Sequence, residues 1–250
     1  MLSALPPQFW PVLLGTLGAV FGSFIATLAI RWPQGRSVAI GRSACDGCGR
    51  TLSASELVPL LSFVALRGRC RSCGTRIATG HPITEMLGAA IGIVAGLVAP
   101  GLEGVAASVC GWLLLALGAI DLAAFWLPDR LTVALAIVAL LGGAARIEPG
   151  LSDRIIGGAG GFATLWIVAT LYRTMRGRTG LGGGDPKLFG AIGLWLGWRA
   201  LPSVLLIASL TGLAVVLAMT GMGRRPTATD RLPLGTLLAA AAFLCWTLSA

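Results

Sequence analysis

The sequence predicts an all-α protein of the membrane, with about eight transmembrane helices and one small polar loop domain. Hydrophobic residues make up 56% of the 250 residues and charged residues only 12%, whereas soluble domains carry about 25% charged residues. A water-soluble chain of this length cannot bury so much apolar surface in one core. The basic residues also alternate in number between successive connections, as they do in multi-pass membrane proteins. The chain is therefore expected to reside in lipid.

Eight apolar runs are candidates for the transmembrane helices. A helix needs about 20 mostly apolar residues to cross the hydrocarbon core of a bilayer. The candidate spans are residues 8–30, 83–99, 104–121, 130–147, 155–172, 187–199, 202–221 and 232–249. Each run is apolar on every face rather than at every second residue, which favours helices over the strands of a membrane barrel. Glycine, with 36 residues, suits the close packing of such helices in lipid.

The placement of Lys and Arg orients these spans. All but three of the 19 basic residues, the exceptions being Arg146, Arg154 and Arg199, lie in the connections that follow odd-numbered spans. Cytosolic loops carry the excess of Lys and Arg, so these connections are expected in the cytosol. Topology and attraction to anionic membrane lipid then account for the net charge of +9. No nucleic-acid partner is expected, because no basic patch is interleaved with aromatic residues.

The connection after the first span is the only polar stretch long enough to form a unit of its own. We therefore expect three parts: a first transmembrane helix at 1–30, a cytosolic loop domain at 31–82, and a seven-helix membrane domain at 83–250. The loop domain contains two C-x-x-C knuckles 21 residues apart, formed by Cys45, Cys48, Cys70 and Cys73. Four thiolates in this arrangement suit a structural, tetrahedral Zn²⁺ site. The alternative, disulfide bonds, is disfavoured in the reducing cytosol.

Two acidic residues, Asp121 and Asp185, stand where the sequence predicts an apolar environment. An ionisable group at membrane depth is costly and by default has a function or a partner. Asp121 ends the third span, where no helix cap requires a carboxylate. Asp185 follows the glycine run Gly182–Gly184, and it could alternatively cap the helix that begins at the next residue. Asp129, which stands just before the fourth span, is interpreted as the cap of that helix.

The topology puts Asp121 and Asp185 at the same, cytosolic level of the membrane. Two carboxylates held close together in a poorly solvated site cannot both ionise, so one keeps its proton. Such a pair can hydrolyse a peptide bond, one member activating water and the other donating a proton. The glycine run would provide a hinge, or space for the close approach of another chain. Paired carboxylates also build cation or proton sites in transporters, and a non-catalytic zinc-loop scaffold is a third interpretation.

Several further motifs accompany these residues. They are Gly22-Ser23-Phe24, Arg31-Trp32-Pro33, the paired knuckles, His81-Pro82-Ile83-Thr84-Glu85, Leu127-Pro128-Asp129 after Asp121, and the G-x-G-D element at Gly182–Asp185 with Lys187. Together they resemble the bacterial type IV prepilin peptidases, intramembrane aspartic peptidases of the GxGD type. The resemblance extends over nearly the whole chain.

The resemblance implies a multi-pass enzyme of the bacterial inner membrane, with its active site and zinc loop facing the cytosol. Its substrates would be type IV prepilins or type II secretion pseudopilins, whose short basic leader is cleaved after a glycine. Asp121 and Asp185 would be the catalytic pair. The substrate or hinge loop would comprise Gly182, Gly183, Gly184 and Lys187. Members with the cysteine domain also methylate the new N-terminus with S-adenosylmethionine, and Glu85 is the candidate residue for that activity, although its position also suits a helix dipole.

Overall fold

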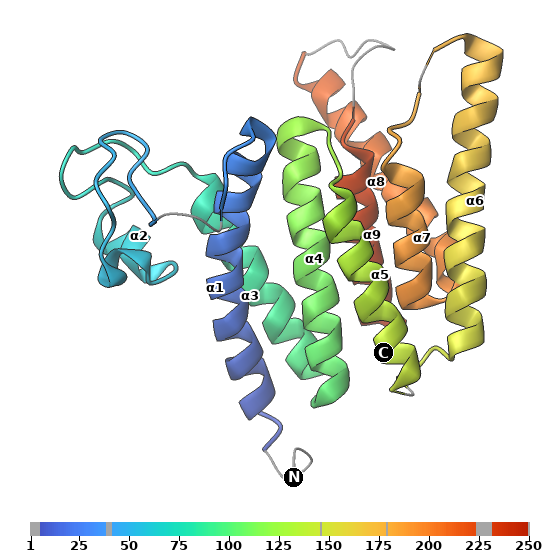
Figure 1. Ribbon diagram of the computed structural model, residues 1–250, viewed down its shortest axis with the longest axis horizontal. Coiled ribbons are helices and arrows are strands. Elements are labelled where there is room, and N and C mark those ends of the chain that lie inside the picture. Colours follow the sequence, from blue (N-terminus) through green and yellow to red (C-terminus); the bar gives the residue numbers. More distant parts are fainter. Residues whose placement is uncertain (1–5, 39–41, 146, 179, 224–231, 250) are drawn as a thin grey trace. The chain divides into compact units, whose positions relative to one another are not determined.

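The computed structural model describes residues 6–38, 42–145, 147–178, 180–223 and 232–249. Within these ranges the regular elements are helices, apart from two isolated β-bridges, Ala44 with Thr51 and Arg69 with Arg76. The predicted all-α class is therefore confirmed (Figure 1). Arg146, one of the three basic residues assigned to the outer side, lies outside the described residues.

A helix forms in each of the eight apolar runs. They are α1 (Phe9–Arg31), α3 (Gly80–Val98), α4 (Leu102–Ala124), α5 (Asp129–Ala144), α6 (Leu151–Arg176), α7 (Asp185–Leu196), α8 (Leu201–Gly221) and α9 (Leu234–Ser249). Among the described residues, α1, α3, α4, α6 and α8 are the five helices long and apolar enough to cross a bilayer. At 12 residues, α7 is only about 18 Å long, against a hydrocarbon core of about 30 Å. Eight crossings thus remain a prediction.

The chain divides into two compact units, Met1–Ser108 and Val109–Ala250, here called the N-terminal and C-terminal units. The boundary falls inside α4, which contributes residues to both. The N-terminal unit contains α1, α3 and the polar loop between them, with the short helices η3 (Ala54–Leu57) and α2 (Leu61–Ala65). The C-terminal unit contains the remainder of α4 and α5 to α9.

Glycine lets α1 and α3 pack as a close antiparallel pair in the N-terminal unit. A Cβ atom at Gly92 would strike the backbone of Leu14, and one at Gly88 would strike that of Gly18. At the other end of the pair, a Cβ at Gly22 would lie 2.6 Å from the Cα of Glu85. Small residues allow backbones in lipid to approach and gain dispersion contacts. The abundance of glycine in the sequence has this packing as one of its causes.

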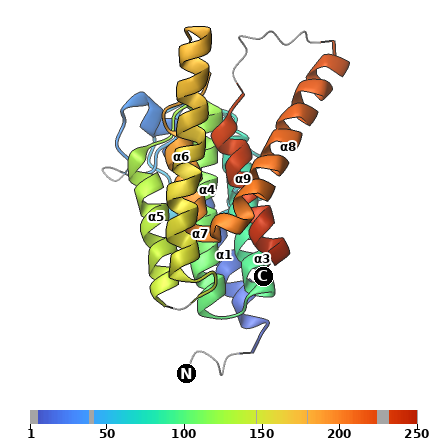
Figure 2. The same ribbon diagram turned by 90° about the vertical axis from the view of Figure 1, so that its right-hand side faces the viewer.

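In the C-terminal unit α7 is the central helix. It packs against α5, α6 and α9 (Figures 1 and 2), and nine of its 12 residues are buried. Its contact with the antiparallel helix α6 again depends on glycine, since a Cβ at Gly157 would lie 2.5 Å from the carbonyl oxygen of Gly193. A helix enclosed on all sides is fixed in position. Asp185, its first residue, is therefore held at a defined place in the unit.

Candidate active site and metal centre

Asp121 is buried three residues before the end of α4, with 5% of its surface exposed. Its Oδ2 accepts a hydrogen bond from the backbone N–H of Thr236 at 2.9 Å and lies 3.3 Å from the Thr236 hydroxyl oxygen. That hydroxyl donates its proton to the carbonyl oxygen of Gly118, at 2.8 Å. Thr236 is in the first turn of α9, whose early N–H groups have no partner within the helix. The start of α9 thus provides the donors that hold the Asp121 carboxylate.

Asp185 is also buried, with 6% exposed. Its Oδ2 accepts a hydrogen bond of 2.9 Å from the backbone N–H of Gly182, three residues earlier. The suggested role as a helix cap is wrong, because α7 begins at Asp185 itself and Gly184 is the capping residue, with no side-chain bond. The carboxylate instead turns back onto Gly182, the first residue of the glycine run.

Leu127 links the surroundings of the two acids. A Cβ added to Gly184 would lie 2.7 Å from the Cβ of Leu127, and one added to Gly235 would lie 2.9 Å from a Leu127 methyl carbon and 3.0 Å from Oδ2 of Asp121. The Asp121 carboxylate contributes to the electrostatic surroundings of Asp185, and both acids lie in the C-terminal unit. The structure therefore brings together the two acids that the sequence paired, and all their hydrogen bonds described above fall on Oδ2.

Asp129 and Lys187 form an ion pair beside this site. The Lys187 ammonium donates to both carboxylate oxygens of Asp129, at 2.8 and 2.9 Å. The interpretation of Asp129 as the cap of α5 is wrong, because the helix begins at Asp129, and its capping residue, Pro128, makes no side-chain hydrogen bond. The ammonium group attracts the carboxylate away from the backbone. Lys187, assigned to the substrate or hinge loop, here joins the first turns of α7 and α5.

Thr236 was not predicted from the sequence as a site residue. It stands in the segment Leu234-Gly235-Thr236-Leu237, at the beginning of the last apolar run. One sequence signal could have identified it. The predicted topology puts the start of the last span at the same membrane face as Asp121 and Asp185. Ser and Thr are nevertheless common at helix starts, so this signal alone does not single out Thr236 as a site residue.

The four cysteines of the loop domain converge on one centre. The sulfur atoms of Cys45, Cys48, Cys70 and Cys73 all lie within 4.8 Å of one another. The sulfurs of Cys45 and Cys73 are 3.8 Å apart, far longer than a disulfide bond of about 2.05 Å. Tetrahedral zinc, with Zn–S bonds of about 2.3 Å, would separate its sulfurs by about 3.8 Å. The donor set fits a metal ion, and all six cysteines are free thiols.

The two knuckles have the same backbone structure. In each, the first cysteine N–H bonds to the carbonyl oxygen five residues later, Arg50 for Cys45 and Thr75 for Cys70. Gly49 and Gly74 close the turns with φ of +70° and +71°, a conformation that favours glycine. Backbone N–H groups of Cys73 and Ser72 lower the pKa of Cys70 to about 6, which favours the thiolate that a metal requires.

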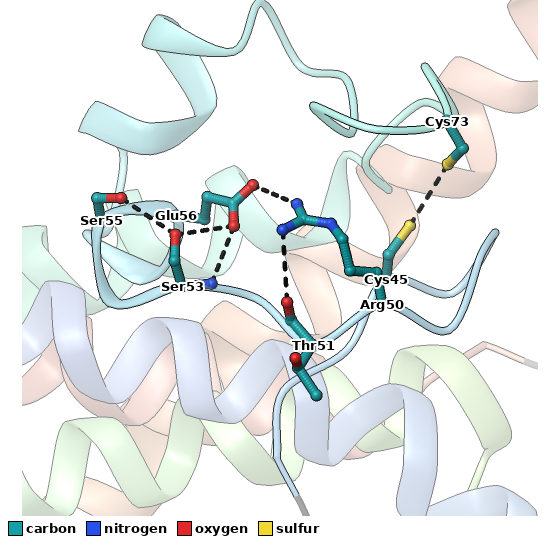
Figure 3. Close-up of polar contacts among 7 residues, drawn as sticks. All are labelled: Cys45, Arg50, Thr51, Ser53, Ser55, Glu56 and Cys73. Carbon is teal, nitrogen blue, oxygen red and sulfur yellow. Dashed lines mark hydrogen bonds and ion pairs between the residues drawn. The ribbon is translucent and has the colours of Figure 1, made fainter.

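A polar network supports the first knuckle (Figure 3). The Arg50 guanidinium bonds to Glu56 at 2.5 Å, and Glu56 also accepts from the N–H and hydroxyl of Ser53, which caps η3. The Arg50 side chain and the Ser53 donors hold the pKa of Glu56 at about 2. The carboxylate therefore stays ionised at neutral pH. Arg50 also interacts with Cys70, so that the network connects both knuckles.

A cavity of about 360 Å³ lies between α1, α3 and the loop domain within the N-terminal unit. Glu85 lines it, is 7% exposed and accepts a hydrogen bond of 2.7 Å from the backbone N–H of Leu60. The lining also contains the cations Arg31 and Arg76, the carboxylate of Glu56 and the rings of Phe24 and Phe63. Glu85 is thus part of a mixed polar and aromatic cavity, and a helix-dipole role alone does not describe its position.

Fold and site together define a helical membrane protein with paired buried carboxylates in one unit and a four-cysteine cluster in the other. Residues 16–98 match the model of the bacterial peptidase A24 N-terminal domain, and residues 108–217, which include both aspartates, match that of the type IV leader peptidase family. The chain belongs to the type IV leader peptidase family. This membership favours the peptidase interpretation over the transporter. No solved structure matches the chain.

Curated relatives named prepilin leader peptidase/N-methyltransferase support the same assignment. One from Burkholderia pseudomallei (strain 1026b) is 41% identical over 210 residues, covering 83% of this chain and 67% of the relative. One from Dickeya chrysanthemi is 36% identical over 235 residues, covering 84% and 83%. One from Klebsiella pneumoniae is 36% identical over 210 residues, covering 81% and 92%.

Proposed function

We propose that the protein is a membrane aspartic endopeptidase that removes the leader of type IV prepilins or type II secretion pseudopilins. Cleavage follows a glycine at the cytosolic face of the bacterial inner membrane, and Asp121 and Asp185 are the catalytic residues. The observation that carries the proposal is the approach of two buried carboxylates, from α4 and α7, in one compact unit. Family membership and the names of the relatives support the substrate class.

The hydrogen bonds distinguish the roles of the two acids. Asp121 accepts from the N–H of Thr236 and also interacts with the backbone N–H of Gly235, whereas Asp185 accepts from the N–H of Gly182. Donors to a carboxylate favour its charged form, so Asp121 is the general base and Asp185 keeps the shared proton. Asp121 takes a proton from water as its oxygen attacks the scissile carbonyl carbon, and Asp185 protonates the carbonyl oxygen. Collapse of the intermediate breaks the C–N bond as Asp121 returns its proton to the amine and Asp185 recovers its own.

The direct test is incubation of the purified protein, in nanodiscs, with a prepilin precursor. Mass spectrometry should find the released leader and a mature chain that begins immediately after the glycine. With S-adenosylmethionine present, the mature chain should gain about 14 Da, the mass of one methylene group. An intact precursor in a sample whose protein is folded would refute the proposed peptidase activity.

We also propose that the cysteine cluster holds one structural Zn²⁺. All four positions of a tetrahedral site would be occupied by cysteine, which leaves no place for a metal-bound water. Wild-type protein is expected to contain about one zinc per chain by plasma mass spectrometry, and Cys48→Ser to contain almost none. Cys110→Ala, which changes a buried cysteine outside the cluster, is the control and should keep its zinc. An unchanged metal content in Cys48→Ser would contradict the assignment.

S-adenosylmethionine is proposed to bind in the cavity beside Glu85. Its volume of about 360 Å³ is within the range of small-molecule sites, about 300–1,000 Å³. When bound, the cofactor would supply an electrophilic methyl group. The Glu85 and Glu56 carboxylates could bind the positively charged groups of the cofactor, and Arg31 could bind its carboxylate. The ring of Phe24 or Phe63 could stack on its adenine.

Replacement of Glu85 by Gln should weaken the binding of S-adenosylmethionine by about 10- to 100-fold. This range corresponds to the loss of a charged contact of about 1.5–3 kcal/mol. The amide keeps an acceptor for the Leu60 N–H, so that the fold is maintained. Titration calorimetry measures the affinity, and Glu103→Gln, an exposed change at the start of α4, is the control. Equal affinities in the Glu85→Gln variant and the control would exclude this cavity.

A further inference from the structure

The Asp129–Lys187 ion pair is exposed to solvent beside the catalytic pair. The side chains of Lys187 and Asp129 are 48% and 65% exposed. Lys187 is two residues beyond Asp185, and Asp129 is two residues beyond Leu127, whose side chain packs against Gly184 and Gly235. The ion pair therefore joins the first turns of α5 and α7 at the end of α7 that begins with Asp185.

Asp129 is distinguished from the other acids that the structure describes in the C-terminal unit. Asp121 and Asp185 are buried. Glu148 and Asp153 lie in the connection to α6 and in its first turn, at the opposite end of α5. Among these described residues, Asp129 alone offers an exposed carboxylate next to the catalytic pair. Two cations are also close to Asp129: Arg130 follows it in the sequence, and Lys187 forms an ion pair with its carboxylate.

We propose that Asp129 binds a Lys or Arg side chain of the substrate peptide, and that Lys187 occupies Asp129 until the substrate displaces it. This inference rests on the proposed peptidase function and adds a specificity-determining residue to it. An exposed ion pair in water contributes little net stability, so the exchange of one ammonium group for another requires little energy. Within the proposed basic-leader substrates, Asp129 would thus be the residue that contacts a leader cation.

The two partners of the pair are predicted to have opposite effects, which a purely structural salt bridge would not produce. With a synthetic precursor whose leader contains Lys, Asp129→Asn should raise KM about fivefold, and Lys187→Gln should lower KM about threefold. Both changes should fall mainly on KM rather than kcat. With the same precursor in which the leader Lys residues are replaced by Gln, the KM values of the variants and the wild type should converge.

The matched control is Glu148→Gln, which removes an exposed acidic residue at the opposite end of α5 and should leave the KM ratio of the two precursors unchanged. KM changes of the same sign in both variants, or equal changes with the Lys and Gln precursors, would overturn the inference. If wild-type protein cleaves neither precursor, the proposed peptidase function itself fails. If it cleaves both with equal KM, only the role of Asp129 fails.

Discussion

Replacement of either Asp121 or Asp185 by Asn is expected to reduce precursor cleavage by about 10²–10⁴-fold, to near the limit of detection. Asn can still accept the hydrogen bonds that Thr236 and Gly182 donate to Oδ2, so that the local structure is kept. It can neither take a proton from water nor supply one to the carbonyl oxygen. Single-turnover cleavage in nanodiscs, followed by mass spectrometry, measures the loss of the chemical step.

Two features of this experiment separate catalysis from folding. Glu103→Gln, an exposed neutralisation on the same helix as Asp121, should cleave at the wild-type rate. The double variant should be no slower than the slower single variant, because residues that act as a unit have non-additive effects. Normal cleavage by either Asn variant, at a purity that excludes wild-type contamination, would remove the shared-proton mechanism.

The pairing of the two acids could be predicted for two reasons. A charge in lipid is costly, and the order of the spans is enough to assign each residue to one face of the membrane. A carboxylate at membrane depth stands out against an apolar run, and the Lys and Arg asymmetry assigned Asp121 and Asp185 to one level. Neither argument requires side-chain detail. The structure buries both residues in the C-terminal unit, and Gly182 of the glycine run contacts the Asp185 carboxylate.

Contacts that depend on short polar side chains could not be predicted in this way. Thr236 contacts Asp121 across 115 residues of sequence, and nothing in its neighbourhood differs from an ordinary helix start. Asp129 was assigned to a cap on local grounds, but a cation from another helix was the stronger partner. In both cases tertiary contacts decided between local alternatives that the sequence leaves nearly equal in energy.

The cysteine motif of the loop domain could be predicted from the sequence, but the polar contacts that support it could not. Two C-x-x-C knuckles, each followed directly by glycine, form two tight turns, and Gly49 and Gly74 close them in the left-handed conformation. The contact between Arg50 and Glu56 (Figure 3) was not predicted, because several arginines in the domain could have occupied the same place. Motifs with fixed backbone geometry are readable from the sequence, whereas the choice among equivalent charged side chains is not.

Arg154 is the residue whose structural role differs most from its sequence interpretation. The Lys and Arg distribution made it one of three basic residues on the outer side, with no further role. In the structure it is 2% exposed, and its five N–H groups lie 2.7–3.1 Å from six carbonyl oxygens, with one N–H shared between two of them. The acceptors are the carbonyl groups of Ala139, Ile147, Glu148, Pro149, Leu194 and Trp195.

These bonds join three helices at one side chain. Leu194 and Trp195 belong to the last turn of α7, whose carbonyl groups have no partner within the helix. A cation at that end also interacts favourably with the helix dipole. Arg154, from the first turn of α6, therefore caps α7 and connects it to α5. Because α7 begins with Asp185, the same guanidinium that closes one end of the helix fixes the position of the carboxylate at the other.

Replacement of Arg154 by Met should accordingly destabilise the protein by about 3–5 kcal/mol, because it leaves several buried carbonyl groups without donors. Thermal unfolding in detergent should show a Tm lower by about 10 °C. Arg154→Lys keeps the charge, but its three donors lack the planar fork of the guanidinium, so an intermediate loss is expected. Arg199→Met is the matched control, since Arg199 is exposed and stacks on Trp198; it should change stability by no more than about 0.5 kcal/mol. Equal Tm values for Arg154→Met and the control would show that α7 is held by packing alone, and that Asp185 does not depend on the guanidinium for its position.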